Sequence, residues 1–276
     1  MNVYAFADEA SASIDKQIEA MKRNGLQGLE IRNVDGVNVS DITLEKAQEV
    51  HEKMEAAGLK VWSIGSPLGK IGIEDAFEPH LEKLKHTLEV AKTLDCKNIR
   101  MFSFYIPDGK EPEDYHEEVM RRLKAMVEAA KDSGIDLCHE NEKGIYGDVA
   151  KRCLDIHKEV PELKGIFDPA NYIQCEQETI EAWEMLHPYI KYLHIKDALE
   201  SGMVVPAGAG IGNLKQIVDA FRAQGGENVT IEPHLTVFEG LRELEGKDRE
   251  IKVGEFKYPD ANTAFDVACD ALKVLL

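Results

Sequence analysis

Four polar residues, each directly after an apolar stretch, are able to form one chemical site: Glu140 in LCHENE, Asp168 in GIFDPAN, His194 in YLHIKDA and Glu232 in VTIEPHL. They are separated by 28, 26 and 38 residues, the spacing of successive strand–helix units, which predicts that they lie on neighbouring strands. Three carboxylates close together would repel one another without a cation, and three oxygen ligands with one imidazole suit a divalent metal. We therefore predict one bound metal ion, Mn²⁺ in the first place and otherwise Mg²⁺, Co²⁺ or Zn²⁺. Each residue alone is weak evidence, because strand ends are often polar.

The segments that must position these residues are short β-branched or aromatic runs alternating with long amphipathic ones, a pattern typical of repeated βα units. Gly25, Gly58 and Gly134 end several of the helical segments. Eight such units favour an α/β fold with a single (β/α)8 TIM barrel domain over residues 1–276; the alternative is an open sheet, which more often has five or six strands. The predicted strands are 3–7, 28–32, 60–64, 98–104, 135–140, 164–168, 191–195 and 228–232.

Two predicted connections are long, residues 105–114 after the fourth strand and about 234–260 after the eighth. Loops that follow barrel strands lie at the catalytic mouth, where they can form a lid or a subunit contact. The charged stretch 242–252 is equally well explained as a solvated loop without such a role.

Composition excludes several classes of function. The net charge of −18 would repel a nucleic acid backbone, so we expect no nucleic acid partner. Asp8-Glu9-Ala10-Ser11 follows the first strand in place of a glycine-rich fingerprint, which disfavours nicotinamide and flavin cofactors. No apolar run approaches the roughly 18 residues needed to cross a bilayer, and the first residues do not form a signal peptide. We expect a soluble cytoplasmic protein with no membrane contact.

The segments HENE, FDPAN, HIKDA and EPHL resemble those of the xylose isomerase-like TIM barrel superfamily, the sugar phosphate isomerase/epimerase family, and the resemblance covers nearly the whole chain. It implies that Glu140, Asp168, His194 and Glu232 bind one metal ion. The superfamily also contains apurinic-site endonucleases, which need further histidine and aspartate ligands. In this chain the ends of the third and fourth predicted strands, VWSIGSP and IRMFSFY, contain no histidine. Asn171 lies where the endonucleases have a further histidine, so the resemblance implies the sugar branch.

The resemblance also implies a mechanism. Moving a proton next to a carbonyl requires a metal that stabilises the enediolate and a base within hydrogen-bond reach. In ketose 3-epimerases of the superfamily two metal-bound glutamates lie on opposite faces of the substrate, which implies that Glu140 and Glu232 are catalytic. Alternatively both glutamates only bind metal, and Lys196 or His139 transfers the proton. Asp168 and His194 are then ligands only, with an unidentified acceptor for the second N–H of the imidazole.

Residues close to the four ligands are expected to contact substrate. Alternation along a strand places a residue two positions after each ligand on the same face as that ligand. Arg32 shares a face with Glu30 and is able either to bind a sugar carboxylate or phosphate or to pair with Glu30. The predicted substrate-binding residues are Arg32, His139, Glu142, Asn171, Lys196 and His234.

Three further features leave alternatives open. Trp62 and Phe104 form either an apolar wall against the sugar or part of the core. The glycine-rich segment 206–212 lacks the Lys and Ser/Thr of a Walker motif and is expected to bring backbone close to substrate. Lys196 and Asp197, which follow His194, are candidates for contacts with substrate hydroxyls or carbonyls, and Lys196 is alternatively able to neutralise surplus carboxylate charge. Relatives commonly have an acidic residue where this chain has Ala209, so that position has no assigned role.

The leading hypothesis is a metal-dependent isomerase or epimerase acting on a small sugar. A metal-dependent lyase or dehydratase acting on a keto-sugar or keto-glycoside would use the same chemistry, and product mass would separate the two. A non-catalytic sugar-binding barrel and a metal-free retaining glycosidase are further alternatives. A homodimer or homotetramer is expected from the family resemblance alone.

Overall fold

Eight parallel strands form a closed barrel in the computed structural model, which describes residues 1–236 and 258–276. Around the barrel the order is β1-β12-β9-β8-β7-β6-β5-β2, and β1 also pairs with β2, which closes the ring. Neighbours in the barrel are therefore neighbours along the chain, as in a (β/α)8 barrel. The barrel strands are β1 (Asn2–Ala5), β2 (Gly28–Ile31), β5 (Lys60–Ile64), β6 (Asn98–Met101), β7 (Asp136–Glu140), β8 (Lys164–Phe167), β9 (Ile190–Ile195) and β12 (Asn228–Ile231).

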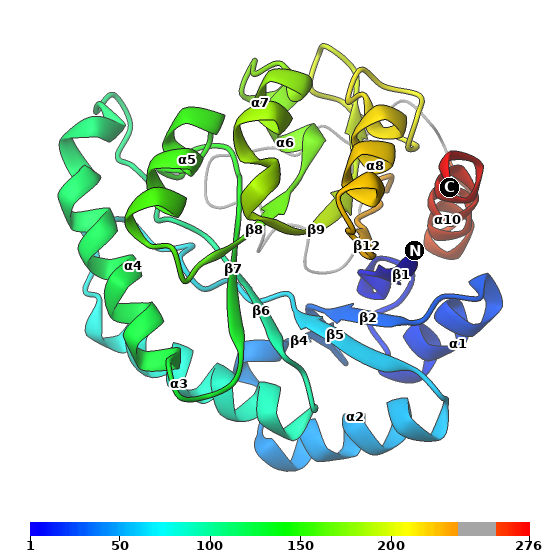
Figure 1. Ribbon diagram of the computed structural model, residues 1–276. Coiled ribbons are helices and arrows are strands. Elements are labelled where there is room, and N and C mark those ends of the chain that lie inside the picture. Colours follow the sequence, from blue (N-terminus) through cyan, green and yellow to red (C-terminus); the bar gives the residue numbers. More distant parts are fainter. Residues whose placement is uncertain (237–257) are drawn as a thin grey trace.

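Helices surround the strands on the outside of the barrel (Figure 1). The last helix, α10, lies beside the first, α1, where Arg23 and Asp266 form an ion pair of 2.8 Å. The two ends of the chain thus meet on the helical ring. The α-helices are α1 (Ile14–Asn24), α2 (Leu44–Ala56), α3 (Glu78–Thr93), α4 (His116–Ala130), α5 (Ala150–Glu159), α6 (Pro169–Gln174), α7 (Thr179–Leu186), α8 (Leu214–Ala223) and α10 (Ala261–Leu275).

Local sequence accounts for where these elements begin and end. The Thr43 hydroxyl accepts a hydrogen bond from the backbone N–H of Lys46 and so caps the first turn of α2. Gly25 ends α1 at φ 68°, a left-handed conformation that costs glycine little. The next strand then begins at Gly28, where a Cβ atom would lie 1.9 Å from the carbonyl oxygen of Lys60 in β5. Only glycine permits β2 and β5 to approach this closely.

Side chains that point into the barrel form layers. In the layer below the site, the Tyr4 and Trp62 rings stack with centroids 5.0 Å apart, and Trp62 meets Tyr192 edge to face. Trp62 is therefore a partly buried residue that packs in the aromatic layer, and Phe104 packs outside the barrel against Phe77. Neither residue forms the apolar wall that was one alternative from the sequence. The layer above the aromatic one contains the charged side chains described below.

The predicted fold class is confirmed: all eight predicted strands are barrel strands, with ends that differ by at most three residues. Sequence periodicity missed two hairpins, β3 (Asn33–Val34) with β4 (Val37–Asn38) and β10 (Asp197–Ala198) with β11 (Val204–Val205), because their two-residue strands are too short for a pattern. The predicted loop 234–260 falls mostly in 237–257, outside the described residues.

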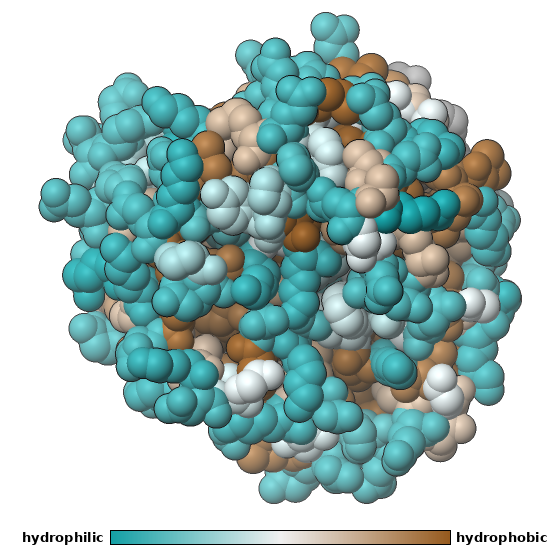
Figure 2. Space-filling view, in the orientation of Figure 1, coloured by the Kyte–Doolittle hydropathy of each residue, from teal (hydrophilic) through white to brown (hydrophobic). Residues whose placement is uncertain are grey.

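The surface facing the viewer is mostly hydrophilic, with smaller hydrophobic areas between the charged side chains (Figure 2). Among the described residues, none of the helices combines the length and apolarity needed to cross a bilayer.

Candidate metal centre

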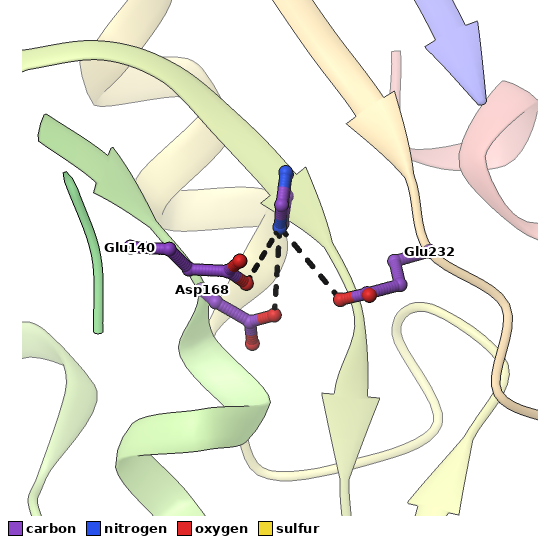
Figure 3. Close-up of side chains that lie close together, drawn as sticks. Glu140, Asp168 and Glu232 are labelled. Carbon is purple, nitrogen blue, oxygen red and sulfur yellow. Dashed lines mark hydrogen bonds and ion pairs between the residues drawn. The ribbon is translucent and has the colours of Figure 1, made fainter. Parts of the chain in front are cut away.

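The four predicted ligands converge at the carboxyl ends of β7, β8, β9 and β12. One atom from each of Glu140, Asp168, His194 and Glu232 lies within 4.8 Å of the other three, and all four residues are buried. The three carboxylates point toward one imidazole in Figure 3. His194 Nδ1 lies 2.8 Å from Glu140 Oε1, 3.9 Å from Asp168 Oδ2 and 3.7 Å from Glu232 Oε2. The structure thus brings together a donor set of three oxygens and one nitrogen.

Buried cations, Lys196 and Arg100 among them, partly neutralise these carboxylates. Lys196 Nζ lies 2.8 Å from Asp168 Oδ2 and 2.7 Å from Glu232 Oε2. Arg100 Nη1 lies 3.3 Å from Glu140 Oε2 and 3.7 Å from Glu232 Oε1. The sequence analysis did not predict Arg100. Because every second residue of a strand lies on the same face, Asn98, Arg100 and Phe102 share one face of the β6 segment, and this pattern would have predicted that Arg100 points inward. A third buried cation, Arg32, contacts Glu232 and also Asp8 and Glu9, so that, apart from the pair of His194 with Glu30, five carboxylates face three cations, and this surplus of negative charge favours a divalent ion.

Burial and charge act in opposite directions on the site carboxyls. Burial disfavours the ionised form of Glu140, but the charges of His194 and Arg100 outweigh burial and lower the pKa of Glu140 to about 2. Burial raises the pKa of Asp168 to about 7, and the nearby ammonium of Lys196 offsets only part of this effect. Glu140 and Asp168, two carboxyls of one site, therefore differ widely in pKa.

His194 has carboxylate partners at both ring nitrogens. Besides Glu140 at Nδ1, Glu30 Oε2 lies 3.1 Å from Nε2, and both Glu30 and His194 are fully buried. Burial opposes protonation of the imidazole, but Glu140 and Glu30 outweigh it and raise the pKa of His194 well above its usual value. Glu30 is thus the acceptor that sequence analysis expected but did not identify. The alternative Glu30–Arg32 pairing is wrong, because Glu30 binds His194 and Tyr192 instead.

Arg32 reaches the centre through Glu232 rather than by facing solvent. Its Nη1 lies 3.3 Å from Glu232 Oε1, while Nε and Nη2 donate to Asp8 at 2.8 and 3.0 Å and Nη2 also donates to Glu9 at 3.1 Å. The predicted bidentate contact is therefore made to Asp8, a residue of this chain, and Arg32 holds Glu232. Asp8 and Glu9, which follow β1, were missed as neighbours of the site.

His234 lies beside the centre on a strained backbone. Its φ is 45°, its backbone N–H donates to Glu9 Oε2 at 2.6 Å, and its Nδ1 lies 3.8 Å from Glu232 Oε1. Burial opposes ionisation of Glu232, but the charges of Lys196 and His234 outweigh it and lower the pKa of Glu232 well below its usual value. Glu9, Glu232 and His234 also form a second group of potential ligands, but the Arg32 guanidinium already lies between its two carboxylates.

Residues in the loops after β7 and β8 hold the segments that carry Glu140 and Asp168. Asn141 and Asp168 exchange two hydrogen bonds of 3.0 Å, and Asn171 Nδ2 donates to the Asn141 carbonyl at 2.8 Å and to Glu140 Oε1 at 3.4 Å. Glu142 forms a 2.7 Å ion pair with Lys70. The structure thus brings Asn171 to the centre, whereas Glu142 contacts a different loop.

Two residues that the sequence predicted to contact substrate, His139 and Asp197, have other partners in the structure. His139 lies on the outer face of β7, where its Nε2 is 3.0 Å from the Ser103 hydroxyl and its ring meets that of His157, so it can be neither the substrate contact nor the alternative base that was expected. Asp197 accepts hydrogen bonds from the backbone N–H groups of Gly208, Gly210 and Gly212. The glycine-rich segment therefore folds around Asp197, and this carboxylate holds the loop rather than a hydroxyl.

The fold and this site agree with the comparison of the sequence with protein families. The sequence model of the xylose isomerase-like TIM barrel family matches residues 18–245, and the chain belongs to that family. A comparison with curated proteins gave no match.

Solved structures of similar shape extend over the whole chain. The probable 3-DHS dehydratase AsbF from Bacillus anthracis is 16% identical with a TM-score of 0.77 over 99% of both chains. D-psicose 3-epimerase from Clostridium cellulolyticum H10, solved with D-tagatose, is 17% identical with a TM-score of 0.75 over 99% of this chain and 98% of that one. The IOLI protein, solved with a zinc atom, is 15% identical with a TM-score of 0.76 over 100% of this chain and 98% of that one. At these identities the likeness establishes the fold alone.

Proposed function

We propose that this protein is a divalent-metal-dependent enzyme that moves a proton next to the carbonyl of a small sugar, as an isomerase or epimerase. The observation that carries the proposal is the group of Glu140, Asp168, His194 and Glu232, whose donor atoms lie within 4.8 Å of one another at the carboxyl end of the barrel. A structural neighbour named D-psicose 3-epimerase and one solved with a zinc atom support the same chemistry.

The donor set fits a metal ion. Among the described residues, Asp168 Oδ2 is buried and accepts no well-aligned hydrogen bond, although Lys196 Nζ lies 2.8 Å away, and it faces His194 Nδ1 across the cluster. Three carboxylates with one imidazole suit Mn²⁺ first, and Mg²⁺, Co²⁺ or Zn²⁺ otherwise. When bound, the ion would polarise the substrate carbonyl and stabilise the enediolate.

The glutamates are suited to proton transfer. Glu140 ends β7 and Glu232 follows β12, and β8 and β9 separate them around the barrel, so their carboxylates approach a central substrate from different sides. Both have a lowered pKa and are ionised at neutral pH, as a base must be before it accepts a proton. We assign removal of the proton to one glutamate, which becomes a carboxylic acid. The other takes up a proton from solvent, gives it to the substrate carbon and is ionised again, and the first then loses its proton to solvent.

Neighbouring side chains would bind the sugar. An ammonium has three donors, and Lys196 faces two carboxylates, which leaves one donor for a substrate oxygen. Asn171 and His234 border the cluster. Glu142, which pairs with Lys70, would have to leave that pair to contact substrate from the loop after β7. Arg32 acts through Glu232 in this proposal. A cytoplasmic location and a homodimer or homotetramer remain predictions from the sequence.

Elimination is the second candidate, because the neighbour named as a probable dehydratase has a TM-score of 0.77. The same deprotonation leads to elimination when a leaving group lies beside the carbanion. Products of unchanged mass indicate isomerisation or epimerisation, and loss of water indicates a dehydratase.

The test combines metal content with proton exchange from heavy water into ketoses and keto-sugars, measured by NMR with and without Mn²⁺. We expect about one metal per chain and metal-dependent exchange, which Glu140→Gln and Glu232→Gln each lower at least about 100-fold. Asp136→Asn is the matched control: Asp136 begins β7 at the opposite end from Glu140 and pairs with Lys191. A protein that exchanges protons on no substrate, with or without Mn²⁺, would contradict the proposal, and cleavage of glycosides after chelation would favour a glycosidase.

A further inference from the structure

A line of hydrogen bonds runs from His194 down the inside of the barrel. His194 Nε2 lies 3.1 Å from Glu30 Oε2. The Tyr192 hydroxyl donates to the other oxygen, Glu30 Oε1, at 2.9 Å, and Ser63 Oγ lies 3.1 Å from the Tyr192 oxygen. Because the tyrosine has one proton and Glu30 accepts it, Ser63 is the donor in the last contact. Each carboxylate oxygen of Glu30 therefore accepts a hydrogen bond, one from Tyr192 and one from His194.

Three strands contribute to this line. Glu30 comes from β2, Ser63 from the neighbouring β5, and Tyr192 and His194 from β9 on the other side of the barrel. Glu30 and His194 are fully buried, and the Tyr192 ring is fixed against Trp62 in the aromatic layer. The Phe6 ring meets the imidazole edge to face at 5.4 Å. These contacts hold the carboxylate and the imidazole from several sides.

A carboxylate at Nε2 has two consequences for a histidine ligand. It keeps a proton on Nε2, so that Nδ1, the nitrogen that faces the three site carboxylates, is the one that gives up its proton and offers a lone pair when a metal binds. It also makes the imidazole a stronger donor, and loss of such outer partners typically weakens metal binding about 10–100-fold.

We propose that Glu30, held by Tyr192 and Ser63, is a positioning residue that fixes the tautomer and the ring orientation of His194 and thereby sets the affinity of the centre for a divalent metal. The inference rests on the metal site of the proposed function, but it concerns residues a layer below the site, which would not touch substrate. It assigns to β2 and β9 a shared part in the metal centre.

The experiment titrates the purified, metal-free protein with Co²⁺ and follows the visible absorption of the bound ion, with Mn²⁺ affinity measured by calorimetry. For Glu30→Gln, an isosteric change, we expect affinity about 10–100-fold lower and an altered cobalt spectrum. Tyr192→Phe should shift affinity in the same direction by a smaller factor. Thr230→Val is the matched control: Thr230 lies opposite His194 in the β9–β12 ladder, and its buried hydroxyl has no hydrogen-bond partner among the described residues.

The outcomes separate the two proposals. If the wild-type protein binds metal and both Glu30→Gln and Tyr192→Phe bind it with unchanged affinity and spectrum, the positioning role is overturned and the metal site stands. If the wild-type protein binds neither ion, both proposals fall. If Glu30→Gln does not fold, Tyr192→Phe decides, because it removes one hydroxyl and keeps the ring that packs against Trp62.

Discussion

Lys196 Nζ lies 2.7 Å from Glu232 Oε2, the oxygen of Glu232 that faces His194 across the cluster. The same ammonium contacts Asp168 Oδ2, so one buried cation joins two of the carboxylates that we assign to a metal. No ion pair links Lys196 to Glu140 among the described contacts, so the ammonium lies to one side of the cluster. The site therefore contains its own cation beside the position proposed for the metal.

Replacing Lys196 tests this cation. Lys196→Met should lower the free energy of unfolding of the metal-free protein by about 3–5 kcal/mol, because two buried carboxylates lose the cation that lies nearest to each. Urea unfolding should show a smaller loss with Mn²⁺ present. Lys215→Met, in an exposed pair with Asp219, should cost less than about 1 kcal/mol. Equal, small effects of the two substitutions would contradict the structural role of Lys196.

Arg32 should be a major source of stability. Arg32→Met removes the buried guanidinium that Asp8, Glu9 and Glu232 share, although Glu232 keeps Arg100, and we expect a loss of about 3–5 kcal/mol. The matched surface variant is Arg23→Met, which removes the half-exposed pair with Asp266 between α1 and α10, at less than about 1 kcal/mol. Chemical denaturation at low and high salt would separate the two, since only the surface pair is screened.

Metal should stabilise the folded protein. At a free Mn²⁺ concentration 100 times Kd, a single site adds about 2.7 kcal/mol, seen as a higher unfolding midpoint in calorimetry that chelation reverses. His194→Asn should lose most of this shift, whereas Asp136→Asn should retain it. A shift of equal size in His194→Asn would show that the ion binds elsewhere.

The stability of the metal-free protein should depend on pH through His139. Burial lowers the pKa of His139 to about 3, while in the unfolded chain it is about 6.5. Below pH 6.5 the unfolded state binds a proton that the folded state does not, so His139 destabilises the fold as the pH falls. Between pH 7.5 and 5 the loss is about 2 kcal/mol for this residue.

His139→Gln keeps a polar group beside the Ser103 hydroxyl and removes the titration. Between pH 7.5 and 5 the free energy of unfolding should therefore fall in both proteins, but the fall in the variant should be about 2 kcal/mol smaller than in the wild-type protein. Urea titrations across this pH range measure the difference. Parallel curves for the two proteins would show that His139 is protonated in the folded state.

The sequence alone determined the barrel and the convergence of four residues on it. Eight runs with strand periodicity and intervening helices define the topology, because alternation and amphipathicity are local properties of the chain. In a parallel barrel all strands end at one face, so Glu140, Asp168, His194 and Glu232, each at the end of an apolar run, had to come close together.

Tertiary structure alone decided how the charges are paired. Whether Arg32 meets Glu30 or Asp8, and whether Glu30 meets Arg32 or His194, depends on contacts across the barrel between residues more than 20 positions apart, and several carboxylates were available to each cation. His139 was misassigned because it adjoins Glu140 in the chain, while the pleat of β7 sends the two side chains to opposite faces. Adjacency along the chain therefore does not reveal the partners of a buried charge, which the packing of distant strands decides.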